Sequence, residues 1–398
     1  MINIRSITYN MPRDYSGEDF DKIKKSSDLW NDYKYFIRTK RLSLPIYQDI
    51  LSKAQLDNIN SFCSDCEIRW FNVPIDPSLI KNKNPFGYAY DILKKYNRAF
   101  VNIICADNGI LYTTNVDKAI NLVKNVSNLS DNGKDNFRLG LSFNTSANCP
   151  FFPFAHSSGN FSFSIALELT QEINVIIQEN KGSDLLKVRN IIIDKLDGYI
   201  ADIYEKAQKI AKETAICFAG FDFSLAPIIE ENGSVISILR QLGIEDFSGN
   251  GVMFITSYLT NILKYFAGKY PSVGFSGVMY SLLEDVELCR INNAKGVSLE
   301  NLIRLSTMCG CGIDMVPIKE NADNREIKSA IFDVYGISTR LNKPLGVRFL
   351  PIPKTKNGKK AYTFFNADSD FISNTVVLDI SVNKISDKYL DCFYYVNN

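Results

Sequence analysis

The stretch that decides the fold runs from residue 185 to residue 223 and reads LLKVRNIIIDKLDGYIADIYEKAQKIAKETAICFAGFDF. Within residues 185–212, apolar side chains recur every three or four positions, the spacing of one face of an α-helix. Residues 214–223 form an apolar, β-prone run, so the stretch predicts a long helix followed by a strand. The helical stripe consists of Ile191, Ile192, Leu196, Ile200, Ile203, Ala207 and Ile210.

On both sides of this unit, strand and helix patterns alternate along most of the chain. Apolar runs or alternation predict strands at 2–9, 99–105, 137–143, 161–169, 345–352 and 375–380. Helical spacing predicts helices at 18–38, 117–126, 234–242, 251–267, 298–308 and 326–341. The 298–308 helix begins at a serine N-cap and is expected to end at Gly310. The alternation predicts a parallel-rich α/β architecture with helices outside, in a single domain over residues 1–398 because no linker or repeat interrupts it.

The composition is that of an ordinary globular chain. Lys and Arg number 45 and Asp and Glu 44, a balance that argues against a nucleic-acid or membrane-surface partner. The basic run at 354–360 is interpreted as a solvated loop, with nucleic-acid contact as the alternative. Nine cysteines without regular spacing, no signal peptide and no apolar run of membrane-spanning length predict a cytoplasmic protein.

The chain contains one histidine, His156. This excludes every metal site that needs two or more histidines, and it makes His156 the base of any Ser-His or Cys-His pair. Cys63 and Cys66 form a lone C-x-x-C, which is half a zinc site. A four-thiolate zinc site with Cys309 and Cys311 is a minor alternative, so no metal is predicted.

Two segments combine polar groups with a stiff or apolar backbone in the middle of the chain. NCPFFPFAH (148–156) is an aromatic loop bracketed by Asn148 and His156, since its two prolines exclude regular structure. It either packs as a proline loop or faces a ligand. In GFDFSLAP (220–227), Asp222 lies between two phenylalanines, where a carboxylate needs a partner. It is a candidate general base or cation ligand, or else a turn or N-cap carboxylate.

Two further segments are rich in glycine. GFSGVM (274–279) lets the backbone approach a ligand or a helix closely, and the following Glu284-Asp285 are expected to face solvent. CGCGIDMVP (309–317) is a glycine-rich break after a helix, with two thiols and a carboxylate. It predicts a reactive thiol or an anion-binding turn, and the alternative is a helix C-cap with buried cysteines.

Several of these segments together resemble the uncharacterised family named domain of unknown function 711. The likeness covers nearly the whole chain and rests on IRSIT (4–8), NCP (148–150), GFDFSLAP (220–227), GFSGVM (274–279), CGCGIDMVP (309–317) and KPLGVRFLPIP (343–353). The family is grouped by fold with pyruvate formate-lyase and ribonucleotide reductase. The resemblance therefore implies a ten-stranded α/β barrel of two five-stranded halves, with helices outside.

The resemblance does not carry over the radical chemistry of those enzymes. Residues 361–398 contain no glycine, which excludes a glycyl radical near that end of the sequence. Cys311 stands where the family usually has a threonine-like residue, so Cys309 is the favoured reactive thiol. The family also implies a link to amino-acid metabolism and a small amino-acid-binding regulatory protein as partner.

We therefore expect a homo-oligomeric enzyme that acts on a small carboxylate- or amino-acid-like metabolite in a pocket at the barrel mouth. No cofactor can be assigned. The alternatives are a non-catalytic metabolite-binding or regulatory protein and, less favoured, a thiyl-radical enzyme activated by a partner. The expected catalytic residues are Cys309, Asp222 and Glu230. The expected substrate-binding residues are Asn148, His156, Ser224, Ser276, Asp314 and Arg348, with Arg348 as a bidentate anion clamp.

Overall fold

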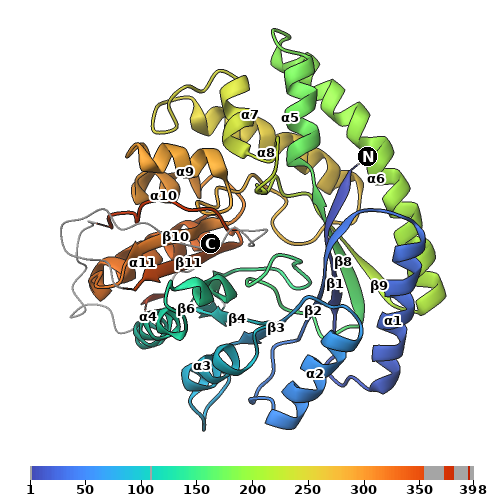
Figure 1. The fold of residues 1–398 in the computed structure, drawn as a ribbon, viewed down its shortest axis with the longest axis vertical. Helices are drawn as coiled ribbons and strands as arrows, with labels where there is room; N and C mark the ends of the chain where they lie inside the picture. Colours follow the sequence, from blue (N-terminus) through green and yellow to red (C-terminus); the bar gives the residue numbers. More distant parts are fainter. Residues whose placement is uncertain (1, 108–109, 354–371, 381–392, 395–398) are drawn as a thin grey trace.

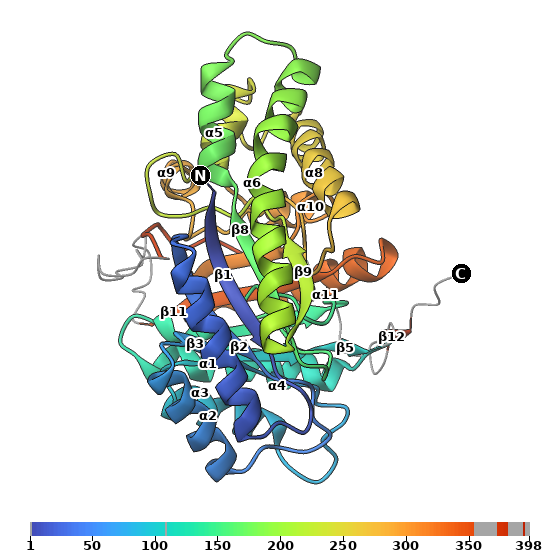
Figure 2. The same cartoon turned by 90° about the vertical axis from the view of Figure 1, so that its right-hand side faces the viewer.

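A computed structural model describes residues 2–107, 110–353, 372–380 and 393–394 of the chain. The strands occupy the interior and the helices lie around the outside (Figure 1). α5 and one end of α6 extend beyond the ends of β1 and β8 (Figure 2). This agrees with the predicted α/β class and its outer helices.

The main sheet has nine strands in the order β10-β11-β7-β4-β3-β2-β1-β8-β9. β1, β2, β3, β4 and β7 run parallel to one another. β8 and β9 form a parallel pair antiparallel to β1, and β10 and β11 form a parallel pair antiparallel to β7. The strands are β1 Asn3–Asn10, β2 Ile37–Ser43, β3 Trp70–Ile75, β4 Ala99–Ile104, β7 Leu139–Phe143, β8 Ser162–Glu168, β9 Cys217–Asp222, β10 Gly312–Lys319 and β11 Leu345–Ile352. A second, three-stranded sheet contains β5 Ala106–Asp107, β6 Ile110–Leu111 and β12 Phe393–Tyr394.

The helices follow the strands along most of the chain and cover the sheet. They are α1 Gly17–Asp32, α2 Lys53–Asp65, α3 Pro85–Lys95, α4 Thr113–Val126, α5 Thr170–Glu179, α6 Leu185–Thr214, α7 Val235–Gln241, α8 Val252–Lys269, α9 Val286–Asn293, α10 Leu299–Leu305 and α11 Asn324–Arg340. Two short 3-10 helices, η1 Ser127–Leu129 and η2 Lys134–Arg138, precede β7.

The predicted long helix is α6, and the strand after it is β9. Asp184 caps α6 by accepting a hydrogen bond from the amide of Lys187, and Ala215 ends it in a left-handed conformation with φ of 55°. All of the predicted stripe is buried except Ile191, which packs partly buried against the core. The periodicity of residues 185–212 therefore predicted both the helix and its buried face.

The expected ten-stranded barrel is confirmed only as a mixed α/β fold with a nine-stranded sheet. Regular strand pairing in the described residues does not join β9 to β10. Between them lies the segment 272–281, which makes isolated parallel bridges to both sides. Phe221 pairs with Ser272 and Leu225 with Val278 beside β9, and Ser281 pairs with Asp314 of β10.

Other expectations for local structure were wrong. Residues 375–380 do not form a regular strand, since they make only isolated bridges such as that between Ile318 and Leu378. The helix predicted at 298–308 ends at Leu305, with Ser306 rather than Gly310 as its C-cap, although Ser298 caps its start as expected. The glycine-rich segment at 309–317 is only partly a break, because β10 begins at Gly312. The basic run at 354–360 lies outside the described residues.

Candidate active site

A small cavity with a volume of about 30 Å³ lies among side chains of β1, β2, β3, β4, β10 and β11 and the loops beside them. A cavity of this size has room for one or two water molecules or a carboxylate-sized group. Arginine, carboxylate and thiol groups line it inside a largely aromatic wall. The lining residues are Arg5, Arg41, Trp70, Phe100, Phe137, Phe151, Phe152, Phe154, Phe275, Met279, Glu284, Cys311, Asp314 and Arg348.

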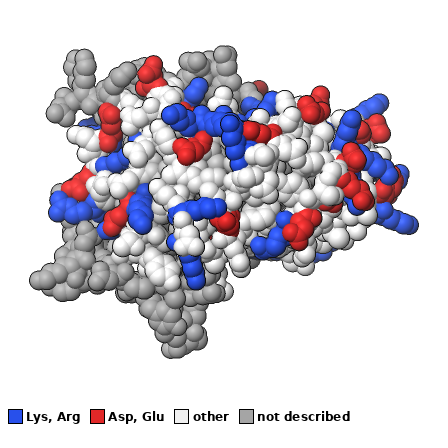
Figure 3. Space-filling view, turned by 90° about the horizontal axis from the view of Figure 1, so that it is seen from below, with Lys and Arg blue, Asp and Glu red and all other residues white. Residues whose placement is uncertain are grey.

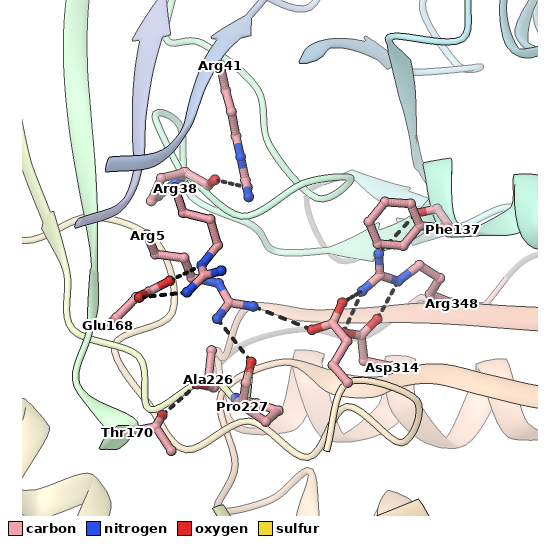
Figure 4. Close-up of polar contacts among 12 residues, drawn as sticks. Arg5, Arg38, Arg41, Phe137, Glu168, Thr170, Ala226, Pro227, Asp314 and Arg348 are labelled. Carbon is pink, nitrogen blue, oxygen red and sulfur yellow. Dashed lines mark hydrogen bonds and ion pairs between the residues drawn. The ribbon is translucent and has the colours of Figure 1, made fainter. Parts of the chain in front are cut away.

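Arg348 is the centre of a buried ion-pair network. It extends from β11, and its Nε and Nη2 donate to Oδ1 and Oδ2 of Asp314 on β10 at 2.7 and 2.8 Å. Nη2 also donates to Oε1 of Glu284 at 3.2 Å, and Nη1 donates to the carbonyl of Phe137 at 3.0 Å (Figure 4). Arg348 has the bidentate geometry that was predicted, but its two donors bind the carboxylate of Asp314 rather than that of a ligand.

Glu284 links Arg348 to Arg5, which comes from β1 at the other side of the cavity. Arg5 Nη2 lies 3.6 Å from Glu284 Oε2, and Arg5 Nη1 donates to the carbonyl of Pro227 at 3.0 Å (Figure 4). Burial raises the pKa of Glu284, while the charge of Arg348 opposes that shift. The expectation that Glu284 and Asp285 face solvent was wrong. Asp285 is buried and caps α9 through the amides of Glu287 and Leu288.

Arg41, on β2, differs from the other two arginines of the cavity. Its Nε donates to Thr39 Oγ1 at 2.9 Å and its Nη1 to the carbonyl of Pro150 at 3.0 Å. Its guanidinium lies 5.2 Å from the ring centroid of Trp70 and 5.3 Å from that of Phe152. Among the described residues it has no carboxylate partner. Burial lowers the pKa of Arg41 to about 9, and the charge of Arg5 acts in the same direction.

The described residues of the cavity wall therefore carry three guanidinium groups and two carboxylates. Among the described residues, the two carboxylates form ion pairs with Arg348 and Arg5, and Arg41 has no ion pair of its own. A buried charge without a counter-charge is costly, so such a site favours an anion when one is offered.

The aromatic loop at 148–156 forms one side of the cavity. The Asn148 amide donates to the carbonyl of His156 at 2.7 Å, and Asn148 Oδ1 accepts from the amide of Ser158 at 2.9 Å. Phe154 fits over the sheet because Gly140 of β7 and Gly346 of β11 leave room for its ring. A Cβ on Gly346 would lie 2.4 Å from Phe154 Cε1. Asn148 therefore holds the two ends of the loop together. The phenylalanines of the loop line the cavity, whereas Asn148 and His156 at its ends do not.

His156 is a neutral, mostly buried side chain rather than a cavity residue. Its Nδ1 is buried without a hydrogen-bond partner in the described residues. Burial lowers the pKa of His156 to about 4. It is not among the residues that line the cavity.

Asp222, Ser224 and Ser276 form a buried polar joint beside the cavity. Asp222 Oδ1 accepts from the amide of Ser224 at 2.7 Å and Oδ2 from the amide of Phe275 at 2.6 Å. Ser276, in a left-handed conformation, accepts through Oγ from the amide of Phe223 at 3.2 Å. These contacts fix the turn that presents Phe275 to the cavity. They match the alternative interpretation of Asp222 as a turn carboxylate.

Glu230, the third residue expected to be catalytic, lies at the surface. Its Oε1 is 2.8 Å from Arg38 Nη1, and 43% of its side chain is exposed. Arg38 also pairs with the buried Glu168 (Figure 4). Glu230 therefore lies in a separate ion-pair group and does not line the cavity.

The two thiols of CGCG (309–312) are both buried, but only Cys311 lines the cavity. Their backbone packs against the 274–279 segment, where a Cβ on Gly277 would lie 3.0 Å from Gly310 Cα. The hydrogen bond from Cys311 lowers the pKa of Cys309, and the nearby charge of Lys343 contributes. The same hydrogen bond, together with burial, raises the pKa of Cys311.

Of the nine expected site residues, the cavity contains Asp314 and Arg348. Sequence reasoning missed Arg5, Arg41 and Glu284. The available signal was the position of Arg5 inside an alternating apolar strand, where a charged side chain pointing inward needs a partner.

Neither a metal centre nor a membrane segment is found in the part of the chain that the structure describes. No three His, Cys, Asp or Glu side chains come together there in a way that would hold a metal ion. No described helix is both long and apolar enough to span a bilayer. On the face shown in Figure 3, basic and acidic side chains are interspersed.

Comparisons with known proteins agree with the resemblance drawn from the motifs. A UPF0210 protein of Pyrobaculum arsenaticum is 25% identical over 232 residues, which are 56% of this chain and 50% of that protein. A UPF0210 protein of Methanocaldococcus jannaschii is 29% identical over 154 residues, 38% of this chain and 34% of the relative. The matches thus span about half or less of these relatives. The family model described as Uncharacterised ACR (DUF711) matches residues 31–364, and the chain belongs to that family.

Proposed function

We propose that the protein is an enzyme that binds a small carboxylate-bearing metabolite in the cavity, with Arg41 as the anchor. The observation that carries this proposal is the charge count of the described wall residues, three guanidinium groups against two carboxylates. A monoanionic ligand would balance it. A carboxylate suits the site because a guanidinium can donate two parallel hydrogen bonds to it, and the aromatic wall around Arg41 strengthens such bonds by excluding water.

Support for catalysis comes from the reactive groups that share the cavity with Arg41. Cys311 supplies a thiol, and Glu284 is a carboxyl group whose pKa burial raises. A ligand held by Arg41 would therefore lie beside a nucleophile and a group able to exchange a proton. A ligand larger than the 30 Å³ cavity requires part of the cavity wall to move.

The experiment is a titration calorimetry comparison of matched acids and amides. Acetate and lactate are expected to bind more tightly than acetamide and lactamide, because only the acids supply the missing charge. Arg41→Met should remove that preference. Arg38→Met, which removes a partly buried arginine outside the cavity, should retain it. Equal binding of acids and amides to the native protein would refute the proposal.

The second candidate is a non-catalytic metabolite-binding protein that uses the same cavity. It is favoured by the pairing of Glu284 and Asp314 with arginines, since these ion pairs oppose proton uptake by either carboxylate. Proton NMR of bound acids over several hours separates the two. Chemical conversion of a carboxylate by the native protein but not by Arg41→Met supports the enzyme. Recovery of each bound acid unchanged supports the binder.

A further inference from the structure

Three phenylalanines of the loop at 148–156 each lie against a different arginine of the cavity. Measured from the central guanidinium carbon to the ring centroid, the pairs are Arg5 and Phe151 at 5.6 Å, Arg41 and Phe152 at 5.3 Å, and Arg348 and Phe154 at 6.0 Å. All of these residues line the cavity. Because a cation attracts the electron-rich face of an aromatic ring, each arginine helps to hold its phenylalanine in the wall.

Packing contacts hold two of these rings from further directions. Phe154 occupies a slot beside Gly140, where a Cβ would lie 2.7 Å from the ring. Phe275 meets Phe151 and Phe154 edge to face, at centroid distances of 6.3 and 6.2 Å. The amide of Phe275 in turn donates to the carboxylate of Asp222. A group in the cavity thus meets aromatic rings that cannot be displaced without breaking several contacts.

Phe152 is the loop ring that lies against the proposed anchor, Arg41. It also packs on Phe100, with the ring centroids 5.5 Å apart, and only 7% of Phe152 is exposed. The cavity of about 30 Å³ has room for a carboxylate-sized group. A carboxylate held by Arg41 therefore has the Phe152 ring beside the carbon chain that it carries.

We propose that the cavity binds carboxylates of one or two carbons most tightly and that Phe152 sets this limit on length. The inference rests on the proposed function, since Arg41 must first hold the carboxylate. In an apolar pocket with spare room, each added methylene strengthens binding about fourfold. Here a longer chain must push aside a ring that Arg41 and Phe100 hold, and overfilling a packed site is unfavourable. The affinity should therefore fall as the chain grows.

A series of straight-chain acids tests the limit: formate, acetate, propionate and butyrate. They carry the same charge and differ only in the length of the carbon chain. Displacement of isotope-labelled acetate, followed by NMR at neutral pH, measures weak binding of every acid on one scale. Butyrate should bind at least about tenfold more weakly than acetate, the discrimination that a misfit of a methylene gives in a pocket. Binding that strengthens about fourfold with each methylene would overturn the limit.

Variants of Phe152 test its role through the ratio of two acids, because a weaker hold on Arg41 would affect both acids alike. Phe152→Ala should raise the affinity for butyrate relative to acetate by about tenfold or more, since the space left by the ring admits the chain. Phe152→Leu removes less of the packing and should raise propionate relative to acetate by about fourfold, which keeps the test available if Phe152→Ala does not fold. Phe143→Leu is the matched control, because Phe143 is a buried β7 residue that is not among those lining the cavity. It should leave both ratios as in the native protein.

The outcomes separate this inference from the function on which it rests. If acetate binds more tightly than acetamide but butyrate binds as tightly as acetate, the length limit is overturned and the carboxylate site stands. If the native protein prefers short acids and folded Phe152→Leu keeps the native ratios, the role of Phe152 is overturned. If acetate binds no better than acetamide, the proposed function fails and this inference fails with it. A preference for short acids that the Phe152 variants relax and Phe143→Leu retains supports both.

Discussion

Replacing Arg41 by methionine should stabilise the ligand-free protein. The guanidinium of Arg41 is buried beside Arg5 and has no carboxylate partner among the described residues. Methionine has a similar unbranched side chain and fills the same space between Trp70 and Phe152 without a charge. A buried charge that lowers the stability of the ligand-free protein is expected where that charge is needed to bind a ligand.

The magnitude follows from the pKa and the lost hydrogen bonds. Burial lowers the pKa of Arg41 from 12.5 to about 9, and each pH unit corresponds to about 1.36 kcal/mol, so the buried charge costs about 5 kcal/mol. The variant loses two hydrogen bonds, to Thr39 and Pro150, at about 1.5 kcal/mol each. Thr39 still donates to the carbonyl of Arg5, and water in the cavity can satisfy Pro150. The expected net gain is about 2 kcal/mol.

Urea denaturation at pH 8 measures the free energy of unfolding of both proteins. Arg348→Met is the matched control and should lose about 3–5 kcal/mol, because it leaves Asp314 buried without its partner and Glu284 with Arg5 alone. The pKa of Arg41 is lower in the folded protein than in the unfolded chain. The buried charge therefore lowers the free energy of unfolding by its full amount below pH 9, and this destabilisation declines as the pH rises above 9. The gap between native and Arg41→Met should therefore be smaller at pH 10. Destabilisation by Arg41→Met at pH 8 would refute the reasoning.

Three further changes test other parts of the site. The double variant Arg348→Met with Asp314→Leu should be more stable than Arg348→Met alone, because it no longer contains the unpaired carboxylate of Asp314. Urea denaturation should show a free energy of unfolding that is higher by about 1–3 kcal/mol. A double variant that is less stable would contradict the pairing of Asp314 with Arg348. Asp222→Ala should lower the free energy of unfolding by about 2–4 kcal/mol through lost amide contacts, whereas Asp222→Asn should retain acetate binding in calorimetry if Asp222 is structural. The folded pKa of His156, about 4, lies below its unfolded value of 6.5, so stability from the neutral ring is present above pH 6.5 and declines as pH falls towards 4. His156→Gln should reduce the loss of stability over that range by about 3 kcal/mol, and an unchanged acid profile in thermal melts would count against a buried neutral histidine.

The sequence predicted elements whose apolar pattern is uninterrupted. α6, β8 and β11 lie within a few residues of their expected positions, since their buried faces repeat at helix or strand spacing. β2 was missed because IRTKRLS (37–43) contains three basic residues and reads as a polar segment. Its Arg41 is buried through contacts with residues far away in the chain, which a local pattern does not contain.

The candidate site was predictable only in part for the same reason. Asp314 and Arg348 stand in glycine- and proline-bearing motifs that attract attention, and both line the cavity. Asp222 stands in an equally conspicuous motif, but three backbone amides near it take up its carboxylate. A conspicuous motif can therefore mark a turn that the fold needs as well as a functional site. The contacts between distant segments decide which of these two roles the motif has.

The network around Glu284 also sets when the fold can be completed. Arg5 is synthesised long before Glu284 and Arg348, which follow it in the sequence by 279 and 343 residues. Until then the early strands carry arginines that have no stable buried position. A nascent chain that stops before Arg348 leaves Glu284 and Asp314 without their main cation, and it should remain open to proteases. The ion pairs of the cavity can therefore form only in chains that already contain Arg5, Glu284, Asp314 and Arg348.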